Sequence, residues 1–150
     1  MTAVRREISK SGTHCIDANV VLRLLNAPEH PAVADLWAEF VAADVMLVAP
    51  TLLSYELANA LHQQVRTGRL PADRANDLLD VALAFPIALH GDARLHARAL
   101  ELAGEHNLSA TYDAHYLALA ERLRAPLWTG DRWLAKKVNG AAAPLMHLVP

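Results

Sequence analysis

Two acidic residues of this chain follow strand-like segments, which is where a parallel sheet places its functional side chains. Asp17 comes directly after residues 13–16, at the point where a helix begins. Asp131 has the same placement, because it follows the apolar residues 126–129 through Gly130. Ligands of open α/β sheets bind at the carboxyl ends of the strands, so both carboxylates are candidates for a functional site. Each is equally well placed to cap the helix that follows it.

Two further acids lie within expected helices, and Asp113 is the more informative of them. Its neighbours at i+3, i+4 and i+7 are Tyr116, Leu117 and Ala120, so its carboxylate is expected on the core side of the helix. Burying a carboxylate costs free energy or shifts its pKa unless a cation or hydrogen-bond donors compensate. The alternative is stabilisation by the helix dipole. Glu56 only borders an apolar helix face, and a solvated glutamate explains its spacing equally well.

A convergence of these four carboxylates would require a cation, because mutual repulsion prevents all of them from ionising together. Hard oxygen ligands select Mg²⁺ or Mn²⁺ over zinc. A hydrated Mg²⁺ can activate a water molecule and stabilise the charge of an in-line displacement at phosphorus. The chemistry that this constellation predicts is phosphodiester hydrolysis.

The segments that must position these acids alternate between short apolar runs and amphipathic helices. This alternation predicts a parallel sheet that is covered on both faces. We expect strands at 13–17, 45–49, 86–90 and 126–129, with a fifth at 145–149. We expect helices from Asn19, over the stripe at 33–41, over 52–66, from Pro71, over 92–106 and over 112–124.

Composition limits the class of protein. The 150 residues, of which 53% are hydrophobic and 20% charged, are typical of one globular domain. Cys15 is the single cysteine, which excludes an internal disulfide, and no Cys/His spacing indicates zinc. No signal-like or membrane-spanning apolar run occurs, so we expect a cytoplasmic protein without a membrane partner. The net charge of −2 offers no support for nucleic-acid binding, which must be argued from the site.

Four short segments resemble the motifs of the PIN-domain family, in order and in spacing. They are residues 15–19, 54–60, 112–120 and 128–131, which contain the four acids, a Tyr-Leu-Ala-Leu-Ala run after the third acid and Thr-Gly-Asp at the fourth. The resemblance begins near residue 13, so we interpret residues 13–150 as a PIN domain. Residues 1–12 form an N-terminal extension to which the sequence assigns no role.

The resemblance implies a PIN-like three-layer α/β/α sandwich with a mostly parallel central sheet of about four or five strands. It also implies an endoribonuclease that depends on Mg²⁺, or on Mn²⁺, and that acts as the VapC-like toxin of a type II toxin–antitoxin system. Its partners would be an RNA substrate, a cognate antitoxin and a second copy of the chain.

The same resemblance implies roles for individual residues. Asp17 and Asp113 would be the principal metal ligands, and Asp131 a ligand directly or through water. Glu56 would orient the attacking water or accept its proton. Asn19 and Thr129 match polar positions that support the site; they and the four acids are the candidate site residues.

A PIN-like module that binds RNA or protein without catalysis is the main alternative, and loss of an acid would favour it. Other enzyme classes fit less well. A haloacid-dehalogenase-type phosphatase requires an Asp where Asn19 stands, a receiver domain requires an acidic pair near its first strand, and a dinucleotide-binding protein requires a Gly-rich turn after it.

Several residues outside the four motifs invite a functional reading as well as a structural one. His115 is close to Asp113 in sequence. Trp133 has no clear core position and could stack on a base. Basic residues near the helical hairpin and after the fourth acid could contact phosphates, although a solvated face explains them equally well: Arg66, Arg69, Arg74, Arg132, Lys136 and Lys137.

Overall fold

A five-stranded, entirely parallel sheet forms the centre of the molecule, in the order β3-β2-β1-β4-β5. The computed structural model describes residues 12–150, so the expected extension at 1–12 lies outside the described residues except for Gly12. The central strand pairs on both sides, with Cys15 opposite Val48 of one neighbour and Leu127 of the other. The strands are β1 (Thr13–Ile16), β2 (Met46–Pro50), β3 (Ile87–His90), β4 (Leu127–Thr129) and β5 (Met146–Leu148).

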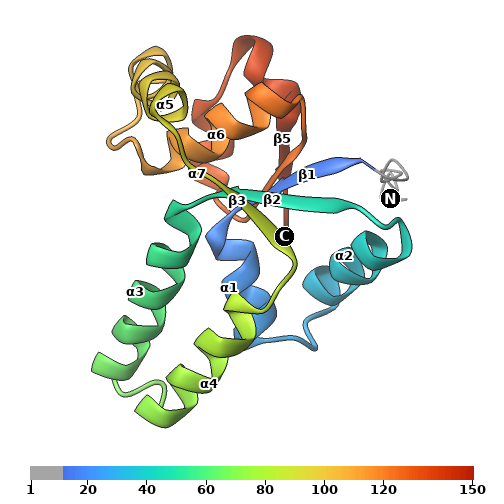
Figure 1. Cartoon of the computed structure of the whole chain (residues 1–150), viewed down its shortest axis with the longest axis vertical. Helices are drawn as coiled ribbons and strands as arrows, with labels where there is room; N and C mark the ends of the chain where they lie inside the picture. Colours follow the sequence, from blue (N-terminus) through green and yellow to red (C-terminus); the bar gives the residue numbers. More distant parts are fainter. Residues whose placement is uncertain (1–11) are drawn as a thin grey trace.

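Helices cover both faces of this sheet, which gives the three layers that the sequence predicted (Figure 1). The helices α5 and α6 pack together over one face, and α1 to α4 lie on the other (Figure 1). Their bounds are α1 (Ala18–Asn26), α2 (Pro31–Ala42), α3 (Leu52–Arg66), α4 (Ala72–Leu83), α5 (Ala93–Glu105), α6 (Tyr112–Leu123) and α7 (Arg132–Lys137), with a 3₁₀ helix η1 (Gly140–Leu145).

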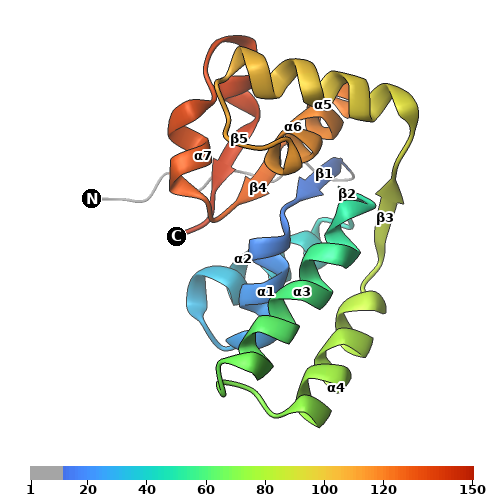
Figure 2. The same cartoon turned by 90° about the vertical axis from the view of Figure 1, so that its left-hand side faces the viewer.

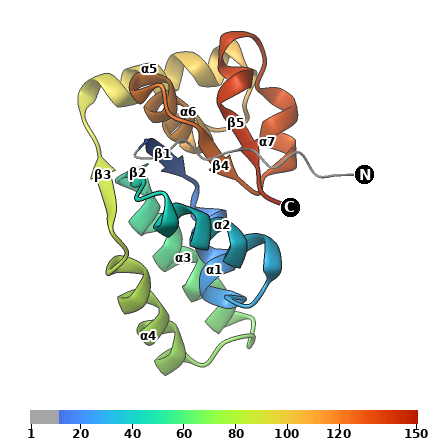
Figure 3. The ribbon, with the colours of Figure 1, turned by 90° about the vertical axis from the view of Figure 1, so that its right-hand side faces the viewer.

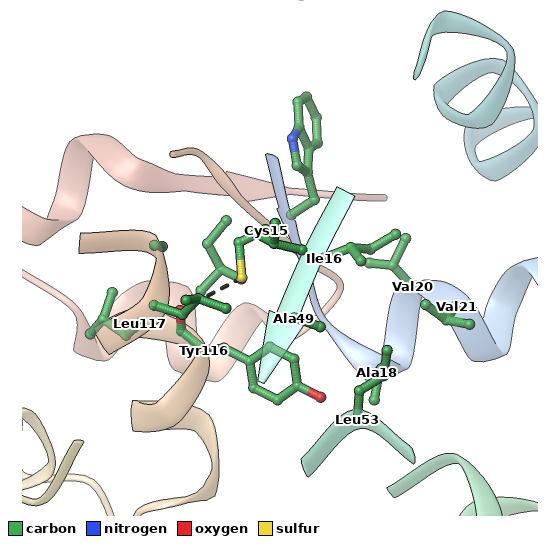
Figure 4. Packing of buried hydrophobic residues seen from close by; sticks show 14 of the residues in the cluster. Cys15, Ile16, Ala18, Val20, Val21, Ala49, Leu53, Tyr116 and Leu117 are labelled. Carbon is green, nitrogen blue, oxygen red and sulfur yellow. Dashed lines mark hydrogen bonds between the residues drawn. The ribbon is translucent and has the colours of Figure 1, made fainter. Parts of the chain in front are cut away.

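The middle of the sheet is apolar on both sides, because helices exclude water from both faces. Cys15, Ile16, Val48 and Leu127 are all buried. The close-up in Figure 4 shows β1 side chains packed between α6 residues on one side and α1 residues on the other. Within residues 12–150, no helix is both long and apolar enough to cross a membrane.

The segment between β4 and β5 differs most from the sequence-based expectation. It forms α7 and η1, whereas the sequence indicated only that Asp131 could cap a helix there. Six residues are too few to display a helical repeat of apolar positions, and Leu134 is the one buried residue of α7. The predicted bounds of the longer elements agree with the structure to within one or two residues.

The carboxyl ends of β1 and β4 face a region where four helices begin. Each of these strands leads directly into a helix, α1 after β1 and α7 after β4. Figure 2 shows α1 and α3 on one side of this region and α6 and α7 on the other. Figure 3, the view from the other side, shows β3 at one edge of the sheet, with α4 leading into it. The fold therefore gathers segments from all four sequence motifs at one place.

Candidate functional site

The buried carboxylate of Asp17 lies at the centre of this region and is held by two side chains that the sequence singled out. Asp17 is only 3% exposed. The Thr129 hydroxyl donates a 2.7 Å hydrogen bond to its Oδ2, and the Asn19 amide donates a second at 3.2 Å. Its side chain forms no capping hydrogen bond with α1, so capping does not explain this acid. Hydrogen bonds to the ionised form are the interactions that a buried carboxylate requires.

The turn that follows β4 is tied to the same network and ends at Asp131. Gly130 N donates to Asn19 Oδ1 at 2.8 Å, and Asp131 N donates to the Thr129 hydroxyl at 3.0 Å. The Asp131 carboxylate accepts hydrogen bonds from the backbone of Trp133 and Leu134, which caps α7. The structural role that the sequence left open for Asp131 is therefore real, and it is compatible with a functional one.

Glu56 of α3 lies near Tyr116 of α6. Its Oε1 is buried without a hydrogen-bond partner, and so is the hydroxyl of Tyr116. Figure 4 shows this hydroxyl directed toward Ala18 and Leu53, near the starts of α1 and α3. The phenol is close enough to favour the ionised form of Glu56, although the two groups do not meet the geometry of a hydrogen bond. Two unsatisfied buried oxygens indicate a site that is incomplete by itself.

Burial and mutual repulsion make these carboxylates harder to ionise. Desolvation raises the pKa of Asp17 to about 7; the Thr129 hydrogen bond opposes this shift, whereas the charges of Asp113 and Glu56 add to it. Desolvation also raises the pKa of Glu56, against the effect of Tyr116 and with that of Asp113. The pKa of Asp113 is raised by burial and then by the charge of Asp131. Each of the four acids thus interacts electrostatically with at least one other.

The oxygen-rich donor set suits a small hard cation rather than zinc. Burial and like charge raise the pKa values of these carboxylates, and a cation would oppose this by favouring their ionised forms. It would also supply a positive charge near the Glu56 oxygen that has no hydrogen-bond partner. In residues 12–150 no three His, Cys, Asp or Glu side chains are close enough to hold one ion together. Mg²⁺ commonly binds through one or two carboxylates and keeps several waters, so this arrangement still fits it.

One residue near the site was not predicted from the sequence. The Arg23 guanidinium of α1 donates hydrogen bonds to the carbonyls of Gly130 and Val149, and so holds the turn before Asp131 in place. A periodicity argument cannot find such a contact, because the two segments are far apart in the chain. His115, which the sequence did single out, forms hydrogen bonds through its two ring nitrogens, with the His96 ring at 2.9 Å and with the Thr111 carbonyl at 2.7 Å.

The sequence and fold of this chain match a known family. A family model of the PIN domain matches residues 14–139. The chain belongs to the PIN-domain family. All four acids and both supporting residues of this PIN domain lie within the matched range.

Two curated relatives carry the name of one PIN-domain ribonuclease group. The chain is 39% identical over 95 residues to Ribonuclease VapC3 of Pyrobaculum aerophilum, and the alignment covers 62% of this chain and 72% of that protein. It is 36% identical over 89 residues to Ribonuclease VapC1 of Mycobacterium tuberculosis, which covers 58% of this chain and 64% of that one. This PIN domain is therefore VapC-like.

Solved structures share its fold. The crystal structure of VapBC2 from Rickettsia felis, bound to a DNA fragment from their promoter, gives a TM-score of 0.66 at 14% identity, covering 91% of this chain and 96% of that one. The structure of PAE2754 from Pyrobaculum aerophilum gives 0.62 at 25% identity, covering 92% and 98%. The expected three-layer fold is confirmed.

Proposed function

We propose that this PIN domain is an endoribonuclease dependent on Mg²⁺ or Mn²⁺, and that it is the toxin of a type II toxin–antitoxin pair acting in the cytoplasm. The observation that carries the proposal is the buried Asp17 carboxylate, which Thr129 and Asn19 hold at the carboxyl ends of β1 and β4. Glu56 of α3 and Asp113 of α6 lie near enough for their charges to act on it, and Asp131 acts on Asp113. The similarity to two proteins named Ribonuclease VapC supports RNA as the substrate.

In this proposal Asp17 and Asp113 hold the cation, and Asp131 contributes through water, because no three acids of residues 12–150 are close enough to bind one ion together. When bound, the cation supplies positive charge that offsets the carboxylates and the charge that develops on the phosphate. Thr129 and Asn19 orient Asp17 by donating hydrogen bonds to Oδ2. Because these donors come from β4 and from the first turn of α1, they fix the carboxylate relative to both elements.

Glu56 is the proposed proton acceptor for the attacking water. Burial raises its pKa, which brings the carboxylate closer to the value at which a general base works near neutral pH. Glu56 is partly exposed, so water can reach its side chain, and its buried Oε1 has no hydrogen-bond partner. The nearby Tyr116 phenol opposes this rise in the pKa of Glu56, so it limits how far burial disfavours the ionised base.

Cleavage of RNA by the purified chain tests the catalytic proposal. We expect cleavage with Mg²⁺ or Mn²⁺ and none in EDTA. Asp17→Asn and Asp113→Asn should abolish it while circular dichroism shows that both variants are folded. Asp80→Asn is the matched control, because Asp80 is an exposed acid of α4. Full activity of either site variant, or cleavage that survives EDTA, would refute the assignment. RNA that binds but is never cut would instead favour the silent PIN-like module.

The toxin role is tested in a bacterial host. Induction of the wild-type chain should stop growth, and induction of Asp113→Asn should not, because the phenotype depends on cleavage. Co-expression of a candidate antitoxin should restore growth to cells with the wild-type chain. Equal growth with both chains would count against a toxin. The proposed homodimer is a separate point, which the mass of the purified chain in solution decides.

A further inference from the structure

The exposed aromatic side chains of this molecule all belong to segments that carry one of the site acids. The chain has three Trp, three Tyr and two Phe, and all of them lie in the described residues. Three are exposed: Tyr55 by 73%, Tyr112 by 62% and Trp133 by 50%. The others are buried or partly buried: Trp37, Phe40, Phe85, Tyr116 and Trp128.

Each exposed aromatic residue is a near neighbour in sequence of one of the acids. Tyr55 precedes Glu56 in α3, and Tyr112 precedes Asp113 at the start of α6. Trp133 is two residues after Asp131, and its backbone N–H donates to that carboxylate at 2.9 Å. Tyr55 and Tyr112 lie about 100° around their helices from Glu56 and Asp113, on the adjoining helix face. We use the term rim for these three aromatic residues and the exposed basic residues of α7.

The rim also carries positive charge on α7. Arg132 and Lys136 are exposed, and neither takes part in an ion pair in the described part of the chain. The Lys137 ammonium lies 4.6 Å above the centre of the Trp133 ring. Arg98 and Arg122, on the helices α5 and α6, are by contrast already paired with acids.

We propose that Tyr55, Tyr112 and Trp133 are stacking platforms for the bases of single-stranded RNA, and that Arg132 and Lys136 contact its phosphates. The inference rests on the proposed ribonuclease function and adds how the substrate is held. Stacking suits this molecule because a net charge of −2 and an acidic site attract a polyanion poorly. Aromatic faces bind unpaired bases without help from net charge and with little dependence on sequence.

Binding of a fluorescein-labelled 12-nucleotide oligouridylate to the full chain in EDTA, followed by anisotropy, tests the platforms without cleavage. Tyr55→Leu, Tyr112→Leu and Trp133→Leu should each weaken binding by about 5- to 100-fold, because leucine keeps apolar area but cannot stack. Tyr112→Phe should keep the wild-type affinity. Leu100→Ala is the control, because Leu100 is 68% exposed on α5 and adjoins no site acid.

Two further readings come from the same titrations. The logarithm of the binding constant should fall with the logarithm of salt concentration with a slope of about −1.4, for two phosphate contacts at about −0.7 each. RNA should also quench tryptophan emission in the wild type, and this quenching should be lost in Trp133→Leu. Failure of the parent chain to bind, leucine variants that bind like the wild type, or a slope near zero would each overturn the inference.

A protein partner is the competing occupant of this rim. If the leucine variants change the mass of the chain in solution while RNA affinity is unchanged, the aromatics belong to a protein interface and the inference is wrong. Failure of the inference is distinct from failure of the proposed function. Cleavage of RNA by the wild-type chain with Mg²⁺ decides whether the chain is a ribonuclease. If the leucine variants cleave RNA with the wild-type KM, only the proposal of stacking platforms is refuted.

Discussion

The buried carboxylate of Asp17 is the residue at which stability and proposed function are most directly opposed. Its pKa is raised to about 7, mainly because burial disfavours the charge. The ionised form therefore destabilises the cation-free protein at neutral pH. Folds retain such a group when another requirement outweighs the cost, and cation binding is the requirement that we propose.

Asp17→Asn should stabilise the cation-free protein. Asparagine can keep the hydrogen bond from Thr129 but carries no charge, so we expect the free energy of unfolding at pH 8 in EDTA to rise by about 1–3 kcal/mol. Urea unfolding followed by circular dichroism measures this change. Asp80→Asn on the exposed side of α4 should change it by less than about 0.5 kcal/mol. A destabilised Asp17→Asn protein would show that the carboxylate is structural.

At the scale of the element, Asp131 has two separable roles, because it caps α7 through its side chain and also belongs to the acidic group. Serine is a good helix cap but has no charge. Comparison of a serine with an alanine at this position therefore separates capping from catalysis.

Asp131→Ala should lower the free energy of unfolding by about 1 kcal/mol, because the Trp133 and Leu134 N–H groups lose their acceptor. Asp131→Ser should retain most of that stability. Both variants should lose RNA cleavage, since neither supplies the carboxylate. Urea unfolding and the cleavage assay, made on the same preparations, give the comparison. Wild-type cleavage by Asp131→Ser would leave capping as the whole role of Asp131.

Elements with a long apolar repeat were predictable from the sequence, as α3 illustrates: its bounds, 52–66, are those expected. Asp17 and Asp131 were candidates because they follow strands, and Asp113 because its helical neighbours are apolar, whereas Glu56 was a candidate mainly through the family resemblance. Contacts between distant segments were not. The bond from Arg23 to the Gly130 carbonyl and the approach of Tyr116 to Glu56 depend on how α1, α3 and α6 pack, which no local pattern encodes.

At the scale of the whole molecule, several buried groups combine to set how stability depends on pH. The folded-state pKa values of Asp17, Glu56 and Asp113 are raised, so the folded state binds more protons than the unfolded state above about pH 4, and stability falls as pH rises through this range. Burial lowers the pKa of His14, so its contribution is lost as pH falls below about 6.5. The acids are more numerous and their direction should prevail.

In EDTA the free energy of unfolding should therefore fall by about 2 kcal/mol between pH 5 and pH 8. Asp92 and Glu121 do not contribute to this pH dependence, because arginine partners lower their pKa values and both stay ionised from pH 5 to pH 8. With Mg²⁺ the decrease should become smaller, because a cation favours the ionised carboxylates of the folded state and binds it selectively. Urea unfolding at pH 5, 6, 7 and 8, with and without Mg²⁺, measures both slopes. In Asp17→Asn the decrease in EDTA should be smaller as well, because one of the carboxylates with a raised pKa is gone. If stability depends on pH equally in the wild type and in Asp17→Asn, the acidic site does not control the stability of the fold. If Mg²⁺ leaves the pH dependence of the wild type unchanged, no cation binds at these carboxylates.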